Sequence, residues 1–269
     1  MNEPIKIITI IQARMASTRL PNKVMMPLAG KPLLLRMYER VYSANYTDTI
    51  VIATTEDKYD DPIVTLCKDN QIKYFRGNST DLLDRHYKAS LPFNPDAVVK
   101  IPSDCPLIDP GIIDKVLKYY IDNKNIFDFV SNLHPASYPD GNDVEIFSAS
   151  ILKDAWLNAK KELEREHTTP YFWENQDRFK VGNVKWESGK DYSMSHRFTI
   201  DYVQDYKFIA RVYEELYTED KIFTLQDILN LLDEKPEIKK INEKYAGVNW
   251  YRNHLDELKT ITKKNTRNA

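Results

Sequence analysis

The sequence is poor in glycine. Only 7 of its 269 residues are glycine, whereas the usual share of about 7% would give roughly nineteen. No stretch matches G-x-G-x-x-G, and none matches G-x-x-x-x-G-K-[ST]. The glycine-rich loops that hold dinucleotides, or the phosphates of P-loop enzymes, are therefore excluded. A nucleotide bound by this chain must be held by other groups.

Cysteines, long apolar runs and excess positive charge are also scarce. The two cysteines, Cys67 and Cys105, are too few for a disulfide framework and match no zinc-binding spacing. No segment approaches the length of a membrane-spanning helix, and the apolar run at 5–11 is too short for a signal peptide. The formal net charge of −2 argues against a general nucleic-acid binder. We expect a cytoplasmic protein with no membrane insertion and no nucleic-acid partner.

Apolar, β-branched runs alternate with amphipathic stretches through the first half of the chain. Strands are predicted at 6–11, 49–53, 72–75, 97–101 and 127–131, and helices at 33–43, 62–70, 82–90 and 112–121. Continuous apolar strands separated by helices are typical of a parallel sheet that is covered on both faces. The sequence therefore predicts a doubly wound α/β domain with a mostly parallel sheet over at least residues 5–135.

The second half of the chain is less regular. After a turn-rich stretch at 133–142, strands are predicted at 144–147, 180–186 and 197–200, and helices at 149–163, 204–216, 225–232 and 236–245. This pattern divides the chain into a main domain at 1–220 and a helical C-terminal extension at 221–269.

The loop after the first predicted strand is charged with one sign only. From position 4 to position 38 the chain has no acidic residue, although it has several basic ones. Directly after the strand come three bases and two hydroxyls: Arg14, Arg19, Lys23, Ser17 and Thr18. Ligands of open α/β sheets bind at the carboxyl ends of the strands, so these side chains could converge on a polyphosphate. The alternative is a solvated basic loop without a ligand.

This loop resembles the opening motif of the cytidylyltransferase family. Segment 10–23 (IIQARMASTRLPNK) is most similar to the SpsF branch of spore-coat polysaccharide biosynthesis proteins, which is related to the acylneuraminate and 3-deoxy-manno-octulosonate cytidylyltransferases. Further similar segments follow in the order of the family: 76–77 (RG), 83–85 (LDR), 103–109 (SDCPLID), 138–141 (YPDG), 144–147 (VEIF), 165–167 (REH) and 197–201 (RFTID). The resemblance implies the Rossmann-like fold of the nucleotide-diphospho-sugar transferases, with a small β insertion.

Two residues of the loop depart from the family pattern. Ala16 and Asn22 stand where the SpsF branch usually has glycine. Asparagine adopts a positive φ more readily than most residues. We therefore expect the loop to keep its shape.

The resemblance assigns a magnesium site to Asp104 and Asp201. Asp104 follows a predicted buried strand, which places it at the same sheet edge as the basic loop. Mg²⁺ takes one or two carboxylates and completes its shell with phosphate oxygens and water. Each aspartate could instead cap a helix, Asp104 before Pro110 and Asp201 before the helix that begins near Val203.

The resemblance also assigns residues to the nucleotide and to the acceptor. The nucleotide-binding positions are Ala13, Arg14, Ser17, Arg19, Lys23, Arg76, Ser79 and Asp84. The acceptor positions are Tyr138, Asp140, Glu145, Glu166 and His167. Two of these regions have structural alternatives, because Arg85, beside Asp84, could lie on a helix surface and His167 could be a structural histidine.

Together these residues imply a Mg²⁺-dependent enzyme that transfers CMP from CTP to a sugar acid or sugar derivative and releases pyrophosphate, for bacterial surface polysaccharide biosynthesis. The resemblance gives the catalytic roles to Arg14, Arg19, Lys23 and Asp104. It makes 1–220 a nucleotidyltransferase domain, in which about 135–200 would form the acceptor pocket or a homodimer contact. Two alternatives stay open. One is a glycosyltransferase, against which the absence of any D-x-D triplet argues, and the other is a catalytically silent nucleotide-sugar-binding protein.

Overall fold

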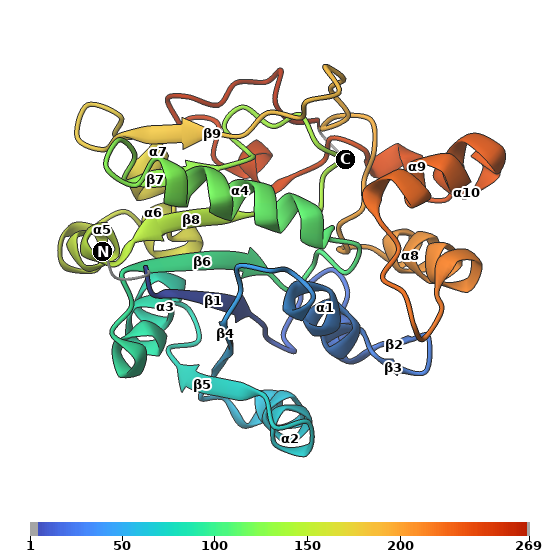
Figure 1. Cartoon of the computed structure of the whole chain (residues 1–269), viewed down its shortest axis with the longest axis horizontal. Coiled ribbons are helices and arrows are strands. Elements are labelled where there is room, and N and C mark those ends of the chain that lie inside the picture. Colours follow the sequence, from blue (N-terminus) through green and yellow to red (C-terminus); the bar gives the residue numbers. More distant parts are fainter. Residues whose placement is uncertain (1–4, 268–269) are drawn as a thin grey trace.

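The computed structural model describes residues 5–267, which form a seven-stranded sheet flanked by helices (Figure 1). The strand order is β5-β4-β1-β6-β8-β7-β9. The strands are Ile7–Gln12 (β1), Thr49–Thr55 (β4), Lys73–Gly77 (β5), Ala97–Pro102 (β6), Phe129–Ser131 (β7), Glu145–Ser148 (β8) and Val181–Asn183 (β9). A separate ribbon pairs Pro27–Leu28 (β2) with Lys31–Pro32 (β3). The predicted mostly parallel sheet is confirmed, since only β8 pairs antiparallel with its neighbours in the large sheet.

Strand β1 is buried on both sides. Successive side chains of a strand point to opposite faces, and accordingly Ile7 and Ile11 enter one apolar layer whereas Ile8 and Ile10 enter the other. Strand β1 pairs in parallel with β4 on one side and with β6 on the other. The order of strands therefore reverses at β1, and this is where open α/β sheets bind ligands beyond their carboxyl ends.

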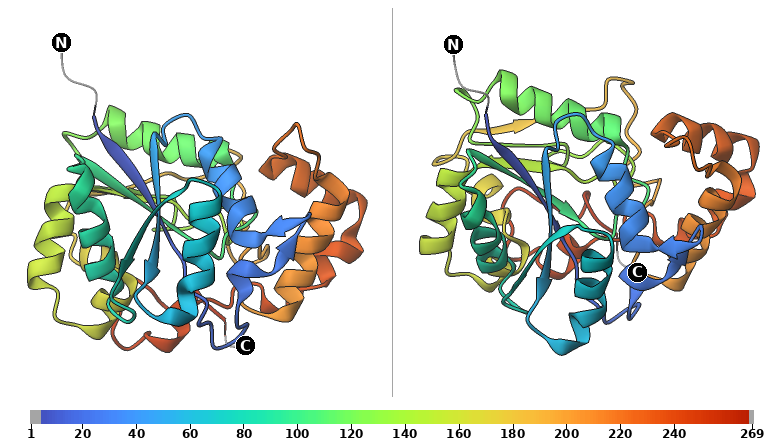
Figure 2. Two further views of the ribbon diagram at one scale, coloured as in Figure 1. Left: turned by 90° about the horizontal axis from the view of Figure 1, so that it is seen from below. Right: turned by 60° about the horizontal axis from the view of Figure 1, so that its bottom comes forward.

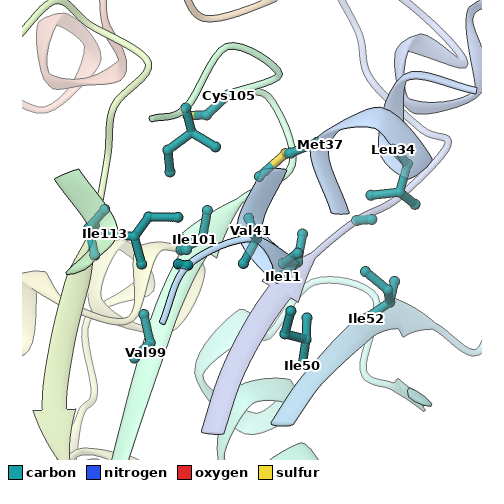
Figure 3. Close-up of a cluster of buried hydrophobic side chains, with 14 of the residues drawn as sticks. Ile11, Leu34, Met37, Val41, Ile50, Ile52, Val99, Ile101, Cys105 and Ile113 are labelled. Atoms are coloured by element: carbon teal, nitrogen blue, oxygen red, sulfur yellow. The ribbon is translucent and has the colours of Figure 1, made fainter. Parts of the chain in front are cut away.

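Helices cover both faces, as the sequence pattern predicts. One face carries α1 (Leu33–Tyr42), α2 (Asp61–Asp69) and α4 (Pro110–Asp122), and the other carries α3 (Leu82–Ser90), α5 (Ala149–Asn158), α6 (Glu162–His167) and α7 (Pro170–Trp173). In Figure 3, Met37 and Val41 of α1 share the apolar layer with Ile113 of α4 and with Ile11 and Val99 of the sheet. The fold is thus doubly wound.

The helix predicted at 149–163 is two helices in the structure. The side chain of Asn158 donates to the carbonyl oxygen of Asp154 (3.0 Å) where α5 ends. The carboxylate of Glu164 accepts from the backbone N–H of Lys161 (3.4 Å) where α6 begins. Such local side-chain bonds to the backbone end one helix and start another, so the continuous helix was wrong.

The strand predicted at 197–200 is an extended segment with a single parallel bridge. Arg197 bridges to Asp140, and Phe198 N donates to the carbonyl oxygen of Asp140 (2.7 Å). Farther along, Ile200 N donates to the carbonyl oxygen of Asp104 (2.9 Å). The segment 197–200 does not form the repeated hydrogen bonds of a β-strand, because it bonds first to the loop at Asp140 and then to the loop at Asp104.

Residues 203–240 form a group of helices at one end of the sheet, coloured orange in Figure 2. These helices are α8 (Val203–Leu216), α9 (Leu225–Glu234) and α10 (Pro236–Lys240). Helix α10 is shorter than the predicted 236–245, and a 3₁₀ turn follows it. The 3₁₀ turns lie at Lys23–Met25, Lys58–Asp60, Leu91–Phe93, Glu243–Tyr245 and Trp250–Asn253. Leu28 and Leu33 share an apolar cluster with Ile228 of α9, so these helices pack directly on the N-terminal part of the chain.

In the described part of the chain, no helix has both the length and the apolar composition needed to span a membrane. The longest helix there, α8, has 14 residues, whereas a spanning helix needs about 20.

Arg40 on α1 is a buried cation that joins three segments. Its side chain is almost fully buried, with 2% of the residue exposed. Its guanidinium donates from Nε to the carbonyl oxygen of Ile108 (2.8 Å), before α4, and from Nη2 to that of Phe223 (2.8 Å), before α9. The same guanidinium lies 4.3 Å from the centroid of the Phe223 ring. Arg40 thus ties the last helices to the sheet domain.

We expect Arg40→Ala to lower the free energy of unfolding by about 3 kcal/mol, because two buried carbonyls lose their charged donor. Urea unfolding followed by circular dichroism measures this change. Arg211→Ala is the matched control, because Arg211 is an exposed residue of α8 whose partners, Glu214 and Glu215, are on the same helix and surface pairs contribute little. Equal unfolding midpoints for the two variants would contradict the role given to Arg40.

Candidate active site

A cavity of about 480 Å³ lies at the carboxyl ends of β1 and β6, where the topology predicts a ligand site. Most of the predicted site residues line it: Ala13, Arg14, Ser17, Arg19, Lys23, Ser79, Asp104, Asp140, Glu145, Glu166, His167 and Asp201. These residues come from segments that are far apart in the sequence. The fold therefore gathers the basic loop, the carboxylates and the predicted acceptor residues around one space.

The loop after β1 is held in place without glycine. Met15 N donates to Asp60 Oδ1 (2.6 Å), and Asn22 N donates to the carbonyl oxygen of Met15 (3.0 Å). Asp60 is buried, and its second oxygen accepts from the backbone N–H of Thr55 (3.3 Å). Asn22 has a φ of 61°, the left-handed conformation expected where relatives have glycine. The loop therefore closes on itself, with Arg14 exposed at the cavity.

Lys23 lies between the two predicted metal-binding aspartates. Its Nζ is 3.1 Å from Asp201 Oδ1 and 3.6 Å from Asp104 Oδ2. It also donates to the carbonyl oxygen of Ile200 (2.6 Å), and its side chain is only 11% exposed. Arg19 Nη2 lies 2.7 Å from the same oxygen of Asp201. Asp104 and Asp201 thus face a single cation position.

Neither of these aspartates caps a helix. Helix α4 is capped by Asp109, which accepts from Gly111 N (2.7 Å). Helix α8 is capped by Asp205, which accepts from Tyr202 N (3.0 Å). The capping alternatives are therefore wrong, and both carboxylates are left for the cavity.

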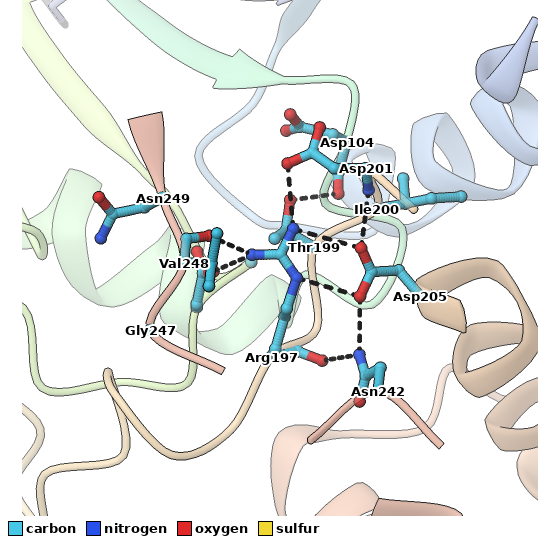
Figure 4. A network of polar contacts seen from close by, with 12 residues as sticks. Asp104, Arg197, Thr199, Ile200, Asp201, Asp205, Asn242, Gly247, Val248 and Asn249 are labelled. Carbon is cyan, nitrogen blue, oxygen red and sulfur yellow. Dashed lines mark hydrogen bonds and ion pairs between the residues drawn. The ribbon is translucent and has the colours of Figure 1, made fainter. Parts of the chain in front are cut away.

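Arg197 holds a cluster of carboxylates together (Figure 4). Its Nη1 lies 3.2 Å from Asp140, its Nη2 3.0 Å from Asp201 and its Nε 3.0 Å from Asp205. Its Nη1 also donates to the carbonyl oxygen of Val248 (2.6 Å). Burial alone would lower the pKa of Arg197, but the carboxylates, Asp140 first, raise it above its ordinary value. The guanidinium stays charged and fixes four segments at the edge of the cavity.

Asp201 is surrounded by three positively charged side chains. Burial would raise its pKa, but Lys23, Arg19 and Arg197 hold the pKa at about 2. Each opposite charge favours the ionised form of the carboxyl group. Asp201 is therefore a carboxylate at any physiological pH.

Two other aspartates near Asp104, Asp140 and Asp143, have raised pKa values. Burial raises the pKa of Asp140 well above its ordinary value, and the charge of Asp143 adds to this although Arg197 opposes it. Burial, followed by the charge of Asp104, raises the pKa of Asp143 to about 7. Asp143 accepts a hydrogen bond from Gly141 N (3.2 Å). The excess of buried acids makes this side of the cavity attractive to a cation.

The carboxylates fit a magnesium ion that a substrate helps to hold. Within residues 5–267, no three His, Cys, Asp or Glu side chains form a complete protein cage for a metal. Mg²⁺ does not need such a cage where phosphate oxygens and water complete its shell. Asp104 and Asp201, which approach one cation from two segments, supply the carboxylates that such an ion requires.

Glu145 is already paired. Strands β6 and β8 run antiparallel with Lys100 opposite Glu145, and their side chains form a buried ion pair. Cross-strand neighbours of opposite charge stabilise a sheet. The carboxylate of Glu145 therefore borders the cavity with its charge balanced.

Arg85 is buried, so the surface-helix alternative is wrong. The residue is 4% exposed, lines the cavity and donates from Nη1 to the carbonyl oxygen of Asn78 (2.7 Å). Its Nε is buried without a hydrogen-bond partner among the described residues. Burial and the neighbouring charge of Arg14 lower its pKa to about 10. At neutral pH, Arg85 thus adds a second positive charge beside Arg14.

Three predicted residues do not line this cavity. Arg76 donates to the carbonyl oxygen of Thr55 (2.9 Å), and its guanidinium lies 2.6 Å from the carboxylate of Asp61. These two contacts fix the end of strand β5. Asp84 accepts from Trp156 Nε1 (2.8 Å), toward α5. Tyr138 lines a neighbouring cavity, with its ring stacked on Trp186. Any effect of these three on the larger cavity must therefore pass through other residues.

The structure adds residues that the sequence reasoning missed. The C-terminal segment returns to the cavity and contributes Val248, Asn249, Trp250, Tyr251, Asn253 and His254. His167 stacks on Trp250, with 3.9 Å between ring centroids. Burial lowers the pKa of His167 to about 3, so the imidazole is neutral. In the sequence, the adjacent aromatic residues at 250–251 were the only indication that this segment belongs to the site. The segment has one 3₁₀ turn and no longer helix or strand whose periodicity could have indicated where it packs.

Comparison with known proteins identifies the family. The family model described as "Cytidylyltransferase" matches residues 8–235. The chain is 39% identical over 241 residues to an uncharacterised protein of Methanocaldococcus jannaschii, a match that covers 88% of this chain and 94% of that one. It is 29% identical over 236 residues to the spore coat polysaccharide biosynthesis protein SpsF of Bacillus subtilis, with coverages of 86% and 95%.

A solved structure agrees with these matches. A cytidylyltransferase from Leptospira borgpetersenii superposes with a TM-score of 0.82 at 32% identity, over 87% of this chain and 97% of that one. The residues matched by the family model, 8–235, include the basic loop, the two aspartates that contact Lys23, and the whole sheet except Ile7. The chain belongs to the cytidylyltransferase family.

Proposed function

We propose that this protein transfers CMP from CTP to a sugar acid or sugar derivative, with Mg²⁺ as cofactor and pyrophosphate as the second product. The observation that carries the proposal is the shared cation position of Asp104 and Asp201, occupied by Lys23 Nζ and bordered by Arg19. A triphosphate and a divalent ion need this combination of carboxylates and cations.

The basic loop would bind the triphosphate. Arg14, Arg19 and Lys23 would neutralise the β- and γ-phosphates, with the hydroxyl of Ser17 as a further donor. Fixed cations at this place stabilise the charge that develops on the leaving pyrophosphate. Arg85 extends the positive surface at the α3 side of the cavity.

The chemical step is an in-line displacement. An acceptor oxygen bonds to the α-phosphorus, the bond from that phosphorus to the bridging oxygen breaks, pyrophosphate leaves with the electron pair, and the hydroxyl proton passes to solvent. Asp104 and Asp201 would hold Mg²⁺, which, when bound, polarises the α-phosphate. The protein contributes mainly positioning and charge.

The acceptor would occupy the part of the cavity that is lined by Asp140, Glu145, Glu166 and His167. Carboxylates and a neutral imidazole are suitable partners for sugar hydroxyls. The resemblance to 3-deoxy-manno-octulosonate cytidylyltransferases favours a sugar acid, and the SpsF relative favours a precursor of surface polysaccharide.

A pyrophosphate-release screen tests the proposal. CTP, UTP, GTP and ATP are each combined with Mg²⁺ and a panel of keto-deoxy sugar acids and sugar phosphates. We expect release with CTP and at least one sugar-type acceptor. A glycosyltransferase would instead consume a finished nucleotide sugar without releasing pyrophosphate, and CTP binding without turnover across the panel would support the catalytically silent alternative.

Asp104→Asn should reduce kcat/KM at least about a hundredfold and leave the fold intact, because a neutral amide is a poor ligand for Mg²⁺. Pyrophosphate release at saturating CTP and circular dichroism measure the two properties. Asp122→Asn is the control, since Asp122 is an exposed residue of α4 that pairs with Lys118. Near-normal turnover in Asp104→Asn would rule out the metal assignment.

Arg19→Ala should raise the KM for CTP about tenfold or more, because a charge-assisted contact to phosphate is lost. Steady-state rates over a range of CTP concentrations measure this effect. Lys31→Ala provides a control from the same acid-free stretch, because Lys31 is exposed, pairs with Glu39 and does not line the cavity. An unchanged CTP dependence in Arg19→Ala would count against the phosphate-binding role of the loop.

A further inference from the structure

The segment Gly247–His254, which we call the C-terminal strap, borders the candidate site although it lies beyond the family-matched residues 8–235. Its residues reach the same cavity as the basic loop, more than two hundred positions earlier in the chain. The strap is therefore a wall of the active site that the family match does not include.

Two anchors hold the strap in place. Before the strap crosses the cavity, Arg197 Nη1 donates to the carbonyl oxygen of Val248 (2.6 Å). Beyond its end, the carboxylate of Glu174, next to α7, accepts from the backbone N–H groups of Lys259 and Thr260, the latter at 2.9 Å. The only regular structure of the strap is the short 3₁₀ turn Trp250–Asn253, so these anchors fix its position.

The strap completes a set of rings that we call the aromatic wall: His134, His167, Trp173, Trp250 and Tyr251. Trp250 stacks on His167 with an interplanar angle of 13°, and its ring centroid is 4.4 Å from that of Tyr251. His134 stacks on Trp173 at 4.3 Å. Tyr251 reaches both, at 6.3 Å from His134 and 6.2 Å from Trp173. The rings come from three distant parts of the chain and are linked to one another by ring contacts.

Three rings of the aromatic wall, His134, Trp250 and Tyr251, line a second cavity as well as the larger one. The smaller one, of about 400 Å³, shares His134, Trp250, Tyr251, Asp140 and Asp143 with the larger one. Each cavity has the size of a small-molecule site. A molecule in the larger cavity that extends past Asp140 and Asp143 would therefore contact these rings.

The wall is uncharged, unlike the basic loop and the aspartates that also line the cavity. Burial first, and the charge of Lys100 second, lower the pKa of both His134 and His167 to about 3. His134 Nδ1 is buried and has no hydrogen-bond partner among the described residues. A neutral histidine offers one donor and one acceptor. The wall therefore presents ring surfaces and uncharged hydrogen-bonding groups.

We propose that the aromatic wall, completed by the strap, is the surface that binds and selects the acceptor, and that Trp250 is a specificity-determining residue. The inference rests on the proposed function. The polyanionic nucleotide matches the cations of the basic loop, whereas the uncharged wall matches carbon–hydrogen faces and uncharged substituents. The acceptor is thus a sugar derivative with a partly apolar face, and a bulky substituent on it has the smaller cavity to enter.

Trp250→Ala tests this assignment with the acceptor that gives the fastest pyrophosphate release. We expect the KM for the acceptor to rise roughly tenfold or more, while the Kd for CTP, measured by calorimetry with Mg²⁺, stays within about twofold. Trp250→Phe, which keeps a ring against His167, should recover much of the acceptor affinity. Glu174→Gln, which weakens an anchor without touching the cavity, should raise the acceptor KM in the same direction.

Asp256→Ala is the control from the same part of the chain, because Asp256 is exposed and lines neither cavity. Thermal unfolding of each variant shows whether it is folded. An unchanged acceptor KM in Trp250→Ala would overturn the inference, as would a loss of CTP affinity by the same factor. No pyrophosphate release by the wild-type protein would instead overturn the proposed function, and this inference with it.

Discussion

The site depends on the ion pairs that the buried guanidinium of Arg197 forms with the carboxylates around it. This guanidinium contacts three carboxylates, on Asp140, Asp201 and Asp205, and the carbonyl of Val248. These groups belong to the loop before β8, the segment before α8, α8 itself and the strap. Such a concentration of buried acids would be costly without a cation among them. The Arg197 side chain therefore fixes the positions of three parts of the site relative to one another. They are the loop that carries Asp140, the proposed metal ligand Asp201 and the strap.

Under the proposed function, Asp201 would exchange its ion-pair partners when CTP and Mg²⁺ bind. Asp201 is held by Arg19 and Lys23 as well as by Arg197. If Mg²⁺ takes the place between Asp104 and Asp201, Lys23 and Arg19 become available for the phosphates. Under the proposed function, binding of CTP and Mg²⁺ would thereby be coupled, because neither alone would release the cations to a complete set of new partners.

The sheet topology explains which parts of the site could be predicted from the sequence. The basic loop and Asp104 directly follow apolar strands, and parallel neighbours end at one edge, so alternation alone placed them together. The roles of Arg85 and Arg197 could not be predicted in this way, because burial and pairing with distant acids leave no local pattern. The aromatic wall was also missed. Its rings are scattered over about 120 positions, and the strap has no periodicity that predicts where it packs.

Under the proposed function, the site has a nucleotide half and an acceptor half, and these two halves are built under different constraints. The nucleotide half consists of strand ends and a loop whose positions follow from the close-packed sheet, so a change there disturbs the core. The acceptor half consists of connections and a strap that are fixed by a few side-chain anchors, such as Glu174 and Arg197. Such segments tolerate substitution and insertion better than a sheet does. Under the proposed function, changes in the strap and in the loop around His134 would alter the acceptor while the nucleotide chemistry stays the same. The family match, which ends at residue 235, would then specify the reaction more closely than the sugar.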